Sequence, residues 1–226
     1  NVLYSFILKS KLSGLTFEDE KFLNLLNALE SMFVRSRLTG TRAYLEPRLS
    51  DVFSEFNPVK AVERINWMKK QSGWYGYWND EAFFNSAGGY IDRYTSKLLL
   101  WKYENSLREL DQNSSYGKLL FEDIKGPQLE HIAPITKPSE VPESGYGEYD
   151  EDFKSKYLDC IGNHLLISGC HNGSIGNRPF EEKRKSYSHL YQQREVQEMT
   201  KNGESWYKKQ ITDRKNKIVN FLLENY

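Results

Sequence analysis

The sequence predicts an α+β fold, in which a mostly helical N-terminal half packs on a small unit of two strands and a helix, followed by C-terminal helices. Apolar residues recur at three- and four-residue spacing through the first 110 residues or so. Short apolar runs bounded by turn residues then follow, and the chain ends in an amphipathic segment. We therefore expect a helical region over residues 1–118 and a mixed region over 119–226, together forming one compact unit.

Composition and charge restrict the class of protein. Hydrophobic residues make up 38% and aromatic residues 14% of the 226 residues, which is typical of a folded globular chain. Basic and acidic residues are equal at 31 each, so any contact with nucleic acid must come from a local patch. Residues 173–217 carry 11 basic and 6 acidic residues, whereas 139–159 carry 2 basic and 7 acidic. The later segment is the expected phosphate-facing surface.

The compartment follows from what the sequence contains. Only Cys160 and Cys170 are present, and we interpret both as reduced, structural residues. There is no apolar run of about 18 residues and no signal-peptide cleavage pattern, so a cytoplasmic protein without a membrane partner is expected. Because the chain opens with Asn1 and enters an apolar segment at once, we expect a fragment of a longer protein.

Helices are predicted for most of the first half. One face after a start signal at Thr16 is lined by Phe22, Leu25, Leu26, Leu29, Met32 and Phe33. Asn57 and Pro58 cap the start of a further helix, and residues 93–110 form another. The aromatic cluster at 73–78 has two uses, stacking on nucleobases or filling a gap between helices, and the second is the commoner.

The second half alternates short elements. A turn at 111–115 is followed by strands at 119–124 and 128–132, a long loop at 134–150 and a short helix at 151–160. Residues 161–167 indicate a turn into a strand, and 172–174 a loop that leads to a helix with Pro179 in its first turn. The last helix is expected over residues 205–225.

The four histidines, at positions 131, 164, 171 and 189, all lie in the second half. A metal-assisted phosphodiesterase needs a base, ligands for a hard cation and a group that orients the base. His131 at the end of a predicted strand is a candidate base, and the adjacent Glu130 a candidate ligand. Strand alternation puts these two side chains on opposite faces, a conflict that a break at Ala133 and Pro134 would relieve.

An ordered set of motifs extends this hypothesis. Glu130-His131-Ile132 with Pro134 is followed by Gly162-Asn163 at a second strand, Asn172 nine positions further on, and an Asn177, Phe180 and Lys183 pattern. The set resembles the HNH nuclease domain, a ββα-metal or His-Me finger fold, at the C-terminal end of GmrSD-family type IV, modification-dependent restriction endonucleases. The specific motifs cover about residues 129–187, and the resemblance extends more loosely over most of the chain.

The resemblance implies a role for each matched residue. His131 matches the general base that activates water, and Asn163 the residue that ties down the connecting loop and orients this histidine. Asn172 matches a metal ligand, and Glu130 stands where relatives often carry an acidic ligand; these oxygen donors favour Mg²⁺ or Mn²⁺. Lys183 is placed to neutralise charge on the phosphate. Two departures are the 31 residues between His131 and Asn163, and a histidine at 164 where relatives carry an apolar residue.

Structural interpretations compete with these roles. His164, His171 and His189 are more often hydrogen-bonded structural residues, and His164 either joins the site or sits on the outer face of its strand. Glu130 is either a metal ligand or an ordinary exposed strand residue. Asn163 and Asn172 could be turn formers, and Lys183 belongs to a charged run that usually marks a solvated helix face.

The leading functional hypothesis is a metal-dependent endonuclease that cuts double-stranded, possibly modified, DNA. The resemblance further implies restriction and antiviral defence, with a separate nucleotide-hydrolysing domain as partner; no phosphate-binding loop motif occurs in this chain. A non-catalytic DNA- or partner-binding module that retains an HNH-like fold is the alternative. A nuclease that acts on RNA or nicks single strands is a third possibility.

Overall fold

The fold is taken from a computed structural model, which describes residues 2–111, 117–139 and 144–226. Most of the turn expected at 111–115 and part of the loop expected at 134–150 lie outside these residues. The chain divides into two compact units, one made of residues up to 87 together with Leu222–Tyr226, the other of Gly88–Phe221. The position expected to separate two regions, near 118, lies within the second unit, because helix α6 (Arg93–Leu110) contacts both strands of the sheet.

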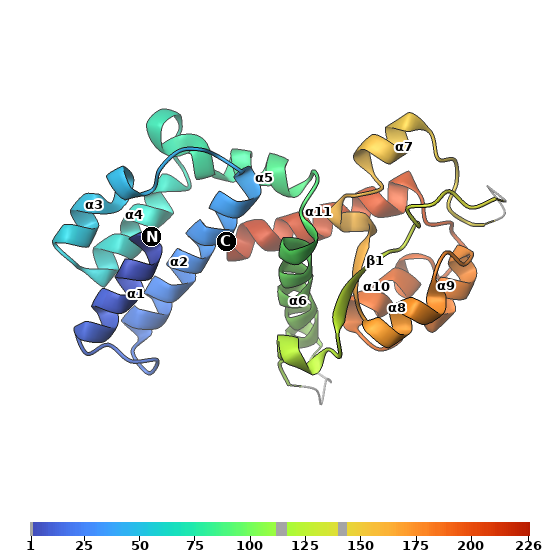
Figure 1. Ribbon diagram of the computed structural model, residues 1–226, viewed down its shortest axis with the longest axis horizontal. Helices are drawn as coiled ribbons and strands as arrows, with labels where there is room; N and C mark the ends of the chain where they lie inside the picture. Colours follow the sequence, from blue (N-terminus) through green and yellow to red (C-terminus); the bar gives the residue numbers. More distant parts are fainter. Residues whose placement is uncertain (1, 112–116, 140–143) are drawn as a thin grey trace. The chain divides into compact units, whose positions relative to one another are not determined.

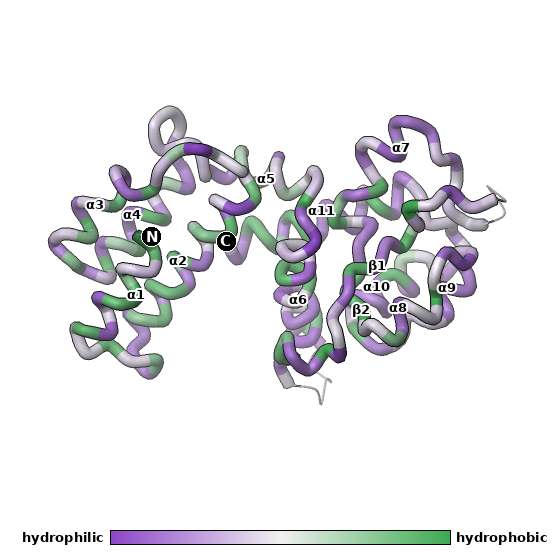
Figure 2. The backbone as a smooth tube through the Cα atoms, viewed as in Figure 1, coloured by the Kyte–Doolittle hydropathy of each residue, from purple (hydrophilic) through white to green (hydrophobic). Residues whose placement is uncertain are grey.

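The first unit is helical, as predicted (Figure 1). Its elements are α1 (Val2–Leu12), α2 (Glu20–Thr39), α3 (Glu46–Ser54), α4 (Pro58–Met68), the 3₁₀ helix η1 (Gly73–Trp78) and α5 (Asp80–Ala87). Figure 2 shows hydrophobic and hydrophilic residues alternating along these helices. The buried face of α2 includes Phe22, Leu25, Leu29 and Met32 as expected, whereas Phe33 is exposed. Asn57 caps α4 through its side chain, as the sequence predicts.

The start of α2 and the aromatic cluster differ in detail from expectation. The helix begins at Glu20 rather than near Thr16, because the carboxylate of Asp19 is held by the backbone and hydroxyl of Thr16 instead of capping α2. In the cluster, Trp78 is fully buried. The guanidinium of Arg48 lies 3.7 Å from the ring centre of Trp74, which is 58% exposed. Packing therefore accounts for part of the cluster.

The second unit contains an antiparallel pair of strands, β1 (Pro127–His131) and β2 (His164–Ser168). Helix α6 and helix α8 (Gly169–Ile175) contact both strands. The remaining elements are η2 (Phe121–Asp123), α7 (Glu151–Lys156), η3 (Ile161–Asn163), α9 (Phe180–Ser186), α10 (Tyr191–Met199) and α11 (Lys208–Asn225), of which α11 belongs to this unit up to Phe221. The predicted α+β class, with a small sheet among helices, is confirmed.

Side chains from helix α10 complete the open edge of β2. Gln192 accepts a hydrogen bond from the backbone N–H of Leu166, and Gln193 donates to the carbonyl of the same residue. The N-terminus of α10 is in turn held by the buried carboxylate of Glu104 on α6, which accepts from the backbone N–H groups of Tyr191 and Gln192. These contacts satisfy polar groups that a two-stranded sheet leaves unpaired and so fix β2 in place.

Three predicted elements are corrected. Residues 119–124 form no strand, because the carbonyl of Leu119 accepts hydrogen bonds from Trp101 and Asn105 on α6, and Phe121–Asp123 form a 3₁₀ turn. Residues 172–174 lie inside α8 rather than in a loop, because the Ser168 hydroxyl caps that helix. The last helix begins at Lys208, three residues after the expected start.

A glycine allows α11 to approach the turn before β2. A Cβ atom at Gly162 would collide with the backbone of Ile211 and with Lys215, so only glycine fits at this contact. The guanidinium of Arg214, fully buried on α11, donates to the carbonyls of Gly162 and His164 at 3.0 and 2.6 Å. Helix α11 thereby holds the start of β2, where the candidate site lies.

Candidate active site

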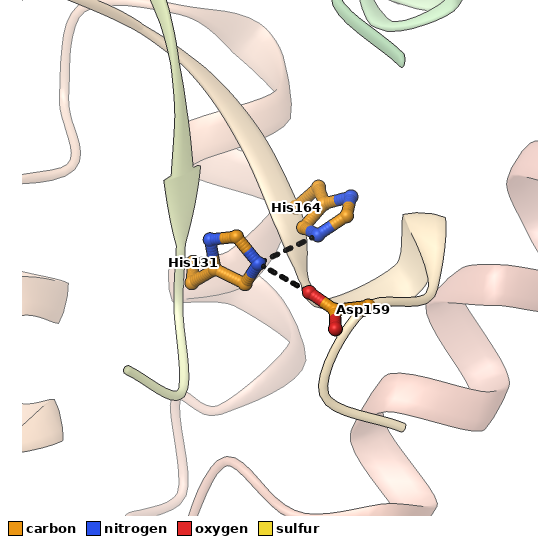
Figure 3. A group of neighbouring side chains, drawn as sticks. All are labelled: His131, Asp159 and His164. Carbon is orange, nitrogen blue, oxygen red and sulfur yellow. Dashed lines mark hydrogen bonds and ion pairs between the residues drawn. The ribbon is translucent and has the colours of Figure 1, made fainter. Parts of the chain in front are cut away.

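The register of the two strands places the candidate base, His131, beside a second histidine. His131, the last residue of β1, is paired directly with His164, the first residue of β2. The ring centres are 4.5 Å apart, with the rings nearly perpendicular. Asp159, in the segment between α7 and η3, approaches the same point (Figure 3). His164 therefore joins the site, one of the two outcomes that the sequence left open.

The two nitrogens of His131 have different surroundings. Its Nε2 lies 3.0 Å from Oδ1 of Asp159 and 3.1 Å from Nε2 of His164. Its Nδ1 lies on the opposite side of the ring from both partners (Figure 3). When Nε2 donates its proton to the Asp159 carboxylate, Nδ1 carries the lone pair of the neutral imidazole. Asp159 thus selects the tautomer of His131.

Burial keeps both imidazoles neutral. It lowers the pKa of His131, an effect that the neighbouring carboxylate of Asp159 opposes and that Arg93 and Lys183 reinforce. The pKa of His164 lies well below its usual value because the ring is buried, with only 2% of the residue exposed, and because His131 lies against it. A neutral His131 is the form that can accept a proton.

Asn163 is fully buried, and its side-chain amide makes four hydrogen bonds. Its Oδ1 accepts from the backbone N–H of Ala133 at 2.9 Å and from the indole of Trp206 at 3.0 Å. Its Nδ2 donates to the carbonyls of Ala133 and Leu158. The amide therefore fixes the chain just after His131, which explains the break after β1 that the sequence placed at Ala133 and Pro134.

Glu130 and Lys183 form a buried ion pair. The Lys183 ammonium lies 2.6 Å from Oε1 of Glu130 and also donates to the carbonyls of His131 and Ile132. Tyr187 is a further partner of the carboxylate. Burial raises the pKa of Glu130 and lowers that of Lys183, while the ion pair opposes both shifts. All three ammonium donors are engaged, so Lys183 holds the end of β1 in position.

A pocket of about 680 Å³ collects most of the predicted site residues. Glu130, His131, Asn172 and Lys183 all line it; Asn163 does not line it and acts from behind His131. Arg93 and Lys97, from the start of α6, add two cationic side chains to its wall. The side-chain amide of Asn172 donates from Nδ2 to Gln128 Oε1 at 2.7 Å, so its oxygen is the atom available to a cation.

Two donor sets in the described residues suit metal ions of different kinds. Asn172 and Glu130 offer oxygen atoms, the donors that Mg²⁺ and Mn²⁺ prefer, although one carboxylate oxygen of Glu130 is already bonded to Lys183. His131, Asp159 and His164 offer two nitrogens and one oxygen, all within 4.8 Å of one another. The first set matches the ligands expected from the sequence.

The sequence did not single out Asp159 or Arg93, and it left His164 undecided. Asp159 is 28 positions from His131, in a segment noted only for its acidic charge. Its one sequence signal is its closeness to Gly162-Asn163. The other histidines form a separate pair: His171 bonds Ser186 and lies 5.2 Å, ring to ring, from His189.

The expected basic surface over 173–217 is largely neutralised by ion pairs. Lys208 bonds Asp150 and Asp152 at 3.0 and 2.8 Å, so the acidic segment 139–159 meets it directly. Arg214 is buried against Glu195, and Arg184 is paired with Glu181. The cations at the pocket are therefore Arg93 and Lys97 from α6, together with Lys183.

The second unit therefore contains a strand, a strand and a helix in this order, with a histidine that ends the first strand and an asparagine on the helix. The sequence profile of the family described as GmrSD restriction endonucleases, C-terminal domain, matches residues 69–221. The chain belongs to this family. Searches of curated proteins and of solved structures each found no match.

Both cysteines are free, as predicted, and no helix in the described part of the chain is long and apolar enough to cross a membrane.

Proposed function

We propose that this domain is a metal-dependent endonuclease that hydrolyses phosphodiester bonds in double-stranded DNA, with His131 as general base. One observation carries the proposal: Asp159 binds Nε2 of His131, so that the lone pair lies on Nδ1, while the same ring lines a pocket that also contains Asn172. A base oriented by a carboxylate beside an oxygen ligand is what hydrolysis by an activated water requires. Membership of a restriction endonuclease family supports the same reaction.

Each residue has a defined task in this proposal. His131 takes the proton of the attacking water at Nδ1, and Asp159 stabilises the imidazolium that results, as a negative charge 3.0 Å from Nε2. Asn163 positions His131 through the backbone of Ala133. Arg93 and Lys97 bind phosphates that flank the cleaved bond.

A divalent metal ion completes the proposed site. Asn172, with Glu130, would hold Mg²⁺ or Mn²⁺, which would supply a positive charge for the phosphate oxygens. Lys183 has all its donors engaged, so we assign it to positioning Glu130 and the end of β1, with its charge adding to the field in the pocket. The restriction endonuclease family supports a role in defence against foreign DNA. We include in the proposal a preference for modified DNA and a separate nucleotide-hydrolysing partner domain, which the resemblance of the motifs implies.

Plasmid cleavage tests the proposal. The purified chain is incubated with modified and unmodified supercoiled plasmid in Mg²⁺ or Mn²⁺, and the His131→Ala variant is compared with wild type. Loss of a general base is expected to lower the rate by about 10²–10⁴-fold, while circular dichroism stays unchanged. His189→Ala, an exposed histidine outside the pocket, is the matched control. Cleavage by His131→Ala at the wild-type rate would refute the assignment of the base.

A further inference from the structure

Three potential ligand atoms lie close together: Nε2 of His131, a carboxylate oxygen of Asp159 and Nε2 of His164. In the proposed hydrolysis, this nitrogen of His131 only binds Asp159. We propose that His131, Asp159 and His164 form a second metal site, specific for a borderline transition-metal ion such as Zn²⁺, and that occupancy of this site switches the general base off. The site is distinct from the oxygen donors of Asn172 and Glu130. The metal-binding part stands on its own, whereas the switch rests on the proposed function.

The spacing of the donors suits a metal ion. Asp159 Oδ1 and His164 Nε2 lie 3.0 and 3.1 Å from Nε2 of His131, and the three ligand atoms all lie within 4.8 Å of one another. Zinc binds nitrogen and oxygen at about 2.0–2.2 Å, so neighbouring ligands in a tetrahedral shell are about 3.4 Å apart. Small movements of these side chains therefore bring the three atoms to the spacing of ligands around one ion.

No placement of a single proton gives all three facing atoms of this cluster a hydrogen bond of their own. If Nε2 of His131 carries the proton, a single N–H is shared between the Asp159 carboxylate and the lone pair of His164. If Nε2 of His164 carries it instead, the lone pair of His131 faces a carboxylate oxygen at 3.0 Å. A cation gives each of the three facing atoms a bond of its own.

Within the part of the chain that the structure describes, the imidazole ring of His164 has no polar contact besides the one with His131. Its Nδ1 is buried without a hydrogen-bond partner, so the ring is held in polar terms only through Nε2, which points at His131. An apolar side chain would fill this interior position, 2% exposed, at lower cost in desolvation. A role as metal ligand explains why an imidazole, that of His164, occupies this position.

The donor types select the metal. Two imidazoles and one carboxylate are the ligands of Zn²⁺ and its neighbours in the first transition row, whereas Mg²⁺ prefers oxygen donors and retains its waters. Asp159, with its side chain 52% exposed, opens the cluster to solvent and provides the entry path. The fourth position of the shell remains for water.

Metal binding at Nε2 would remove the base. A neutral imidazole has one N–H and one lone pair, so a metal ion on the Nε2 lone pair of His131 places the proton on Nδ1. Nδ1 is the atom proposed to accept the proton of water. No proton is gained or lost by the ring, yet its tautomer no longer permits catalysis.

Cobalt titration of the whole chain tests the metal site. Co²⁺ is used as a spectroscopic probe of the site, with Zn²⁺ as competitor. We expect a visible absorption band that saturates at one ion per chain and is abolished by Zn²⁺. Asp159→Asn, which changes an exposed side chain, and His164→Leu should each weaken Co²⁺ binding by at least about tenfold. His189→Gln should leave the affinity for Co²⁺ unchanged. No band in wild type, or equal affinity in all four proteins, would overturn the site.

The switch is tested separately by cleavage in excess Mg²⁺ with increasing Zn²⁺, each protein being compared with its own zinc-free rate. Wild type and His189→Gln should be inhibited over the range in which Co²⁺ binds, and Asp159→Asn only at concentrations at least about tenfold higher. Cobalt binding without any nuclease activity would leave the metal site standing and remove the proposed function. Cleavage that is insensitive to Zn²⁺ in a chain that binds Co²⁺ would overturn the switch.

Discussion

His131 and His164 occupy directly opposed positions on β1 and β2, and their Nε2 atoms are 3.1 Å apart. This relationship makes the chemistry of His131 dependent on the second strand and on Asp159, which approaches the same nitrogen. The two nitrogens of His131 therefore have different roles: Nε2 contacts protein groups, and Nδ1 is proposed to accept the proton of water. The predictions below separate these roles from purely structural ones.

The pH dependence of cleavage should report the environment of His131. Because burial lowers the pKa of His131 from its usual 6.5, the base stays neutral at neutral pH. The rate, kcat/KM, should therefore hold down to pH values below 6.5 and fall as the pH drops through the lowered pKa. Initial cleavage rates measured between about pH 5 and 8 check this.

Asp159→Asn shifts that profile in a defined direction. The Asp159 carboxylate favours the protonated imidazole, so its removal should lower the pKa of His131 further and move the acid limb to lower pH. The rate itself should fall by about 10–100-fold, as expected for a group that orients a functional histidine. An unchanged limb and rate would argue that Asp159 has no part in the reaction; Asp152→Asn on α7 is the control.

The ion pair of Glu130 and Lys183 should be important for stability. Lys183→Met leaves the buried carboxylate of Glu130 without its main partner, which should cost about 3–5 kcal/mol of unfolding free energy. Because two uncharged side chains tolerate burial better than one lone charge, adding Glu130→Gln should recover part of this loss. Urea unfolding measures both. Lys185→Met on the same helix, where the side chain is 71% exposed, should change stability by less than about 0.5 kcal/mol.

Two asparagines should respond in opposite ways. Asn163→Ala leaves the buried N–H groups of Ala133 and Trp206 unpaired, each at a cost of about 1–3 kcal/mol, and should lower the melting temperature markedly. Asn172→Ala, at the pocket wall, should leave the melting temperature nearly unchanged and abolish Mg²⁺-dependent cleavage. Thermal melts and plasmid cleavage assays on both variants separate the loss of stability from the loss of activity. Full activity of Asn172→Ala would remove this residue from the proposed ligands.

Arg93 should contribute to DNA affinity through a phosphate. In a His131→Ala background, which prevents cutting, Arg93→Ala should weaken binding to a DNA duplex and reduce the slope of log affinity against log salt by about 0.9. Fluorescence anisotropy at several salt concentrations measures this slope. Lys154→Ala, an exposed lysine on α7 that does not line the pocket, is the control and should leave the slope as it is. Equal slopes for both variants would place the DNA elsewhere.

Local patterns in the sequence predicted several elements of the fold, some of which carry the site. The apolar period of α6 gave its bounds, the Asn57 and Pro58 signal gave the start of α4, and Gly162-Asn163 marked the turn into β2. The wrong predictions have a cause outside the local sequence. Residues 119–124 are apolar enough for a strand, yet Trp101 and Asn105 bind the carbonyl of Leu119, and no neighbouring residue reveals this.

What the sequence by itself determined is the list of groups: a histidine followed by a break in the strand, two asparagines nine positions apart, and a glutamate and a lysine whose burial it did not predict. Their order supported the family, because motif order is a property of the chain alone. Tertiary structure decided which atoms meet. The strand register places His131 opposite His164, and the chain after α7 brings Asp159 to the same nitrogen of His131. The packing of α9 pairs the ammonium of Lys183 with the carboxylate of Glu130. Contacts across 28 to 53 positions depend on how separate elements pack, and no local period in the sequence encodes that packing.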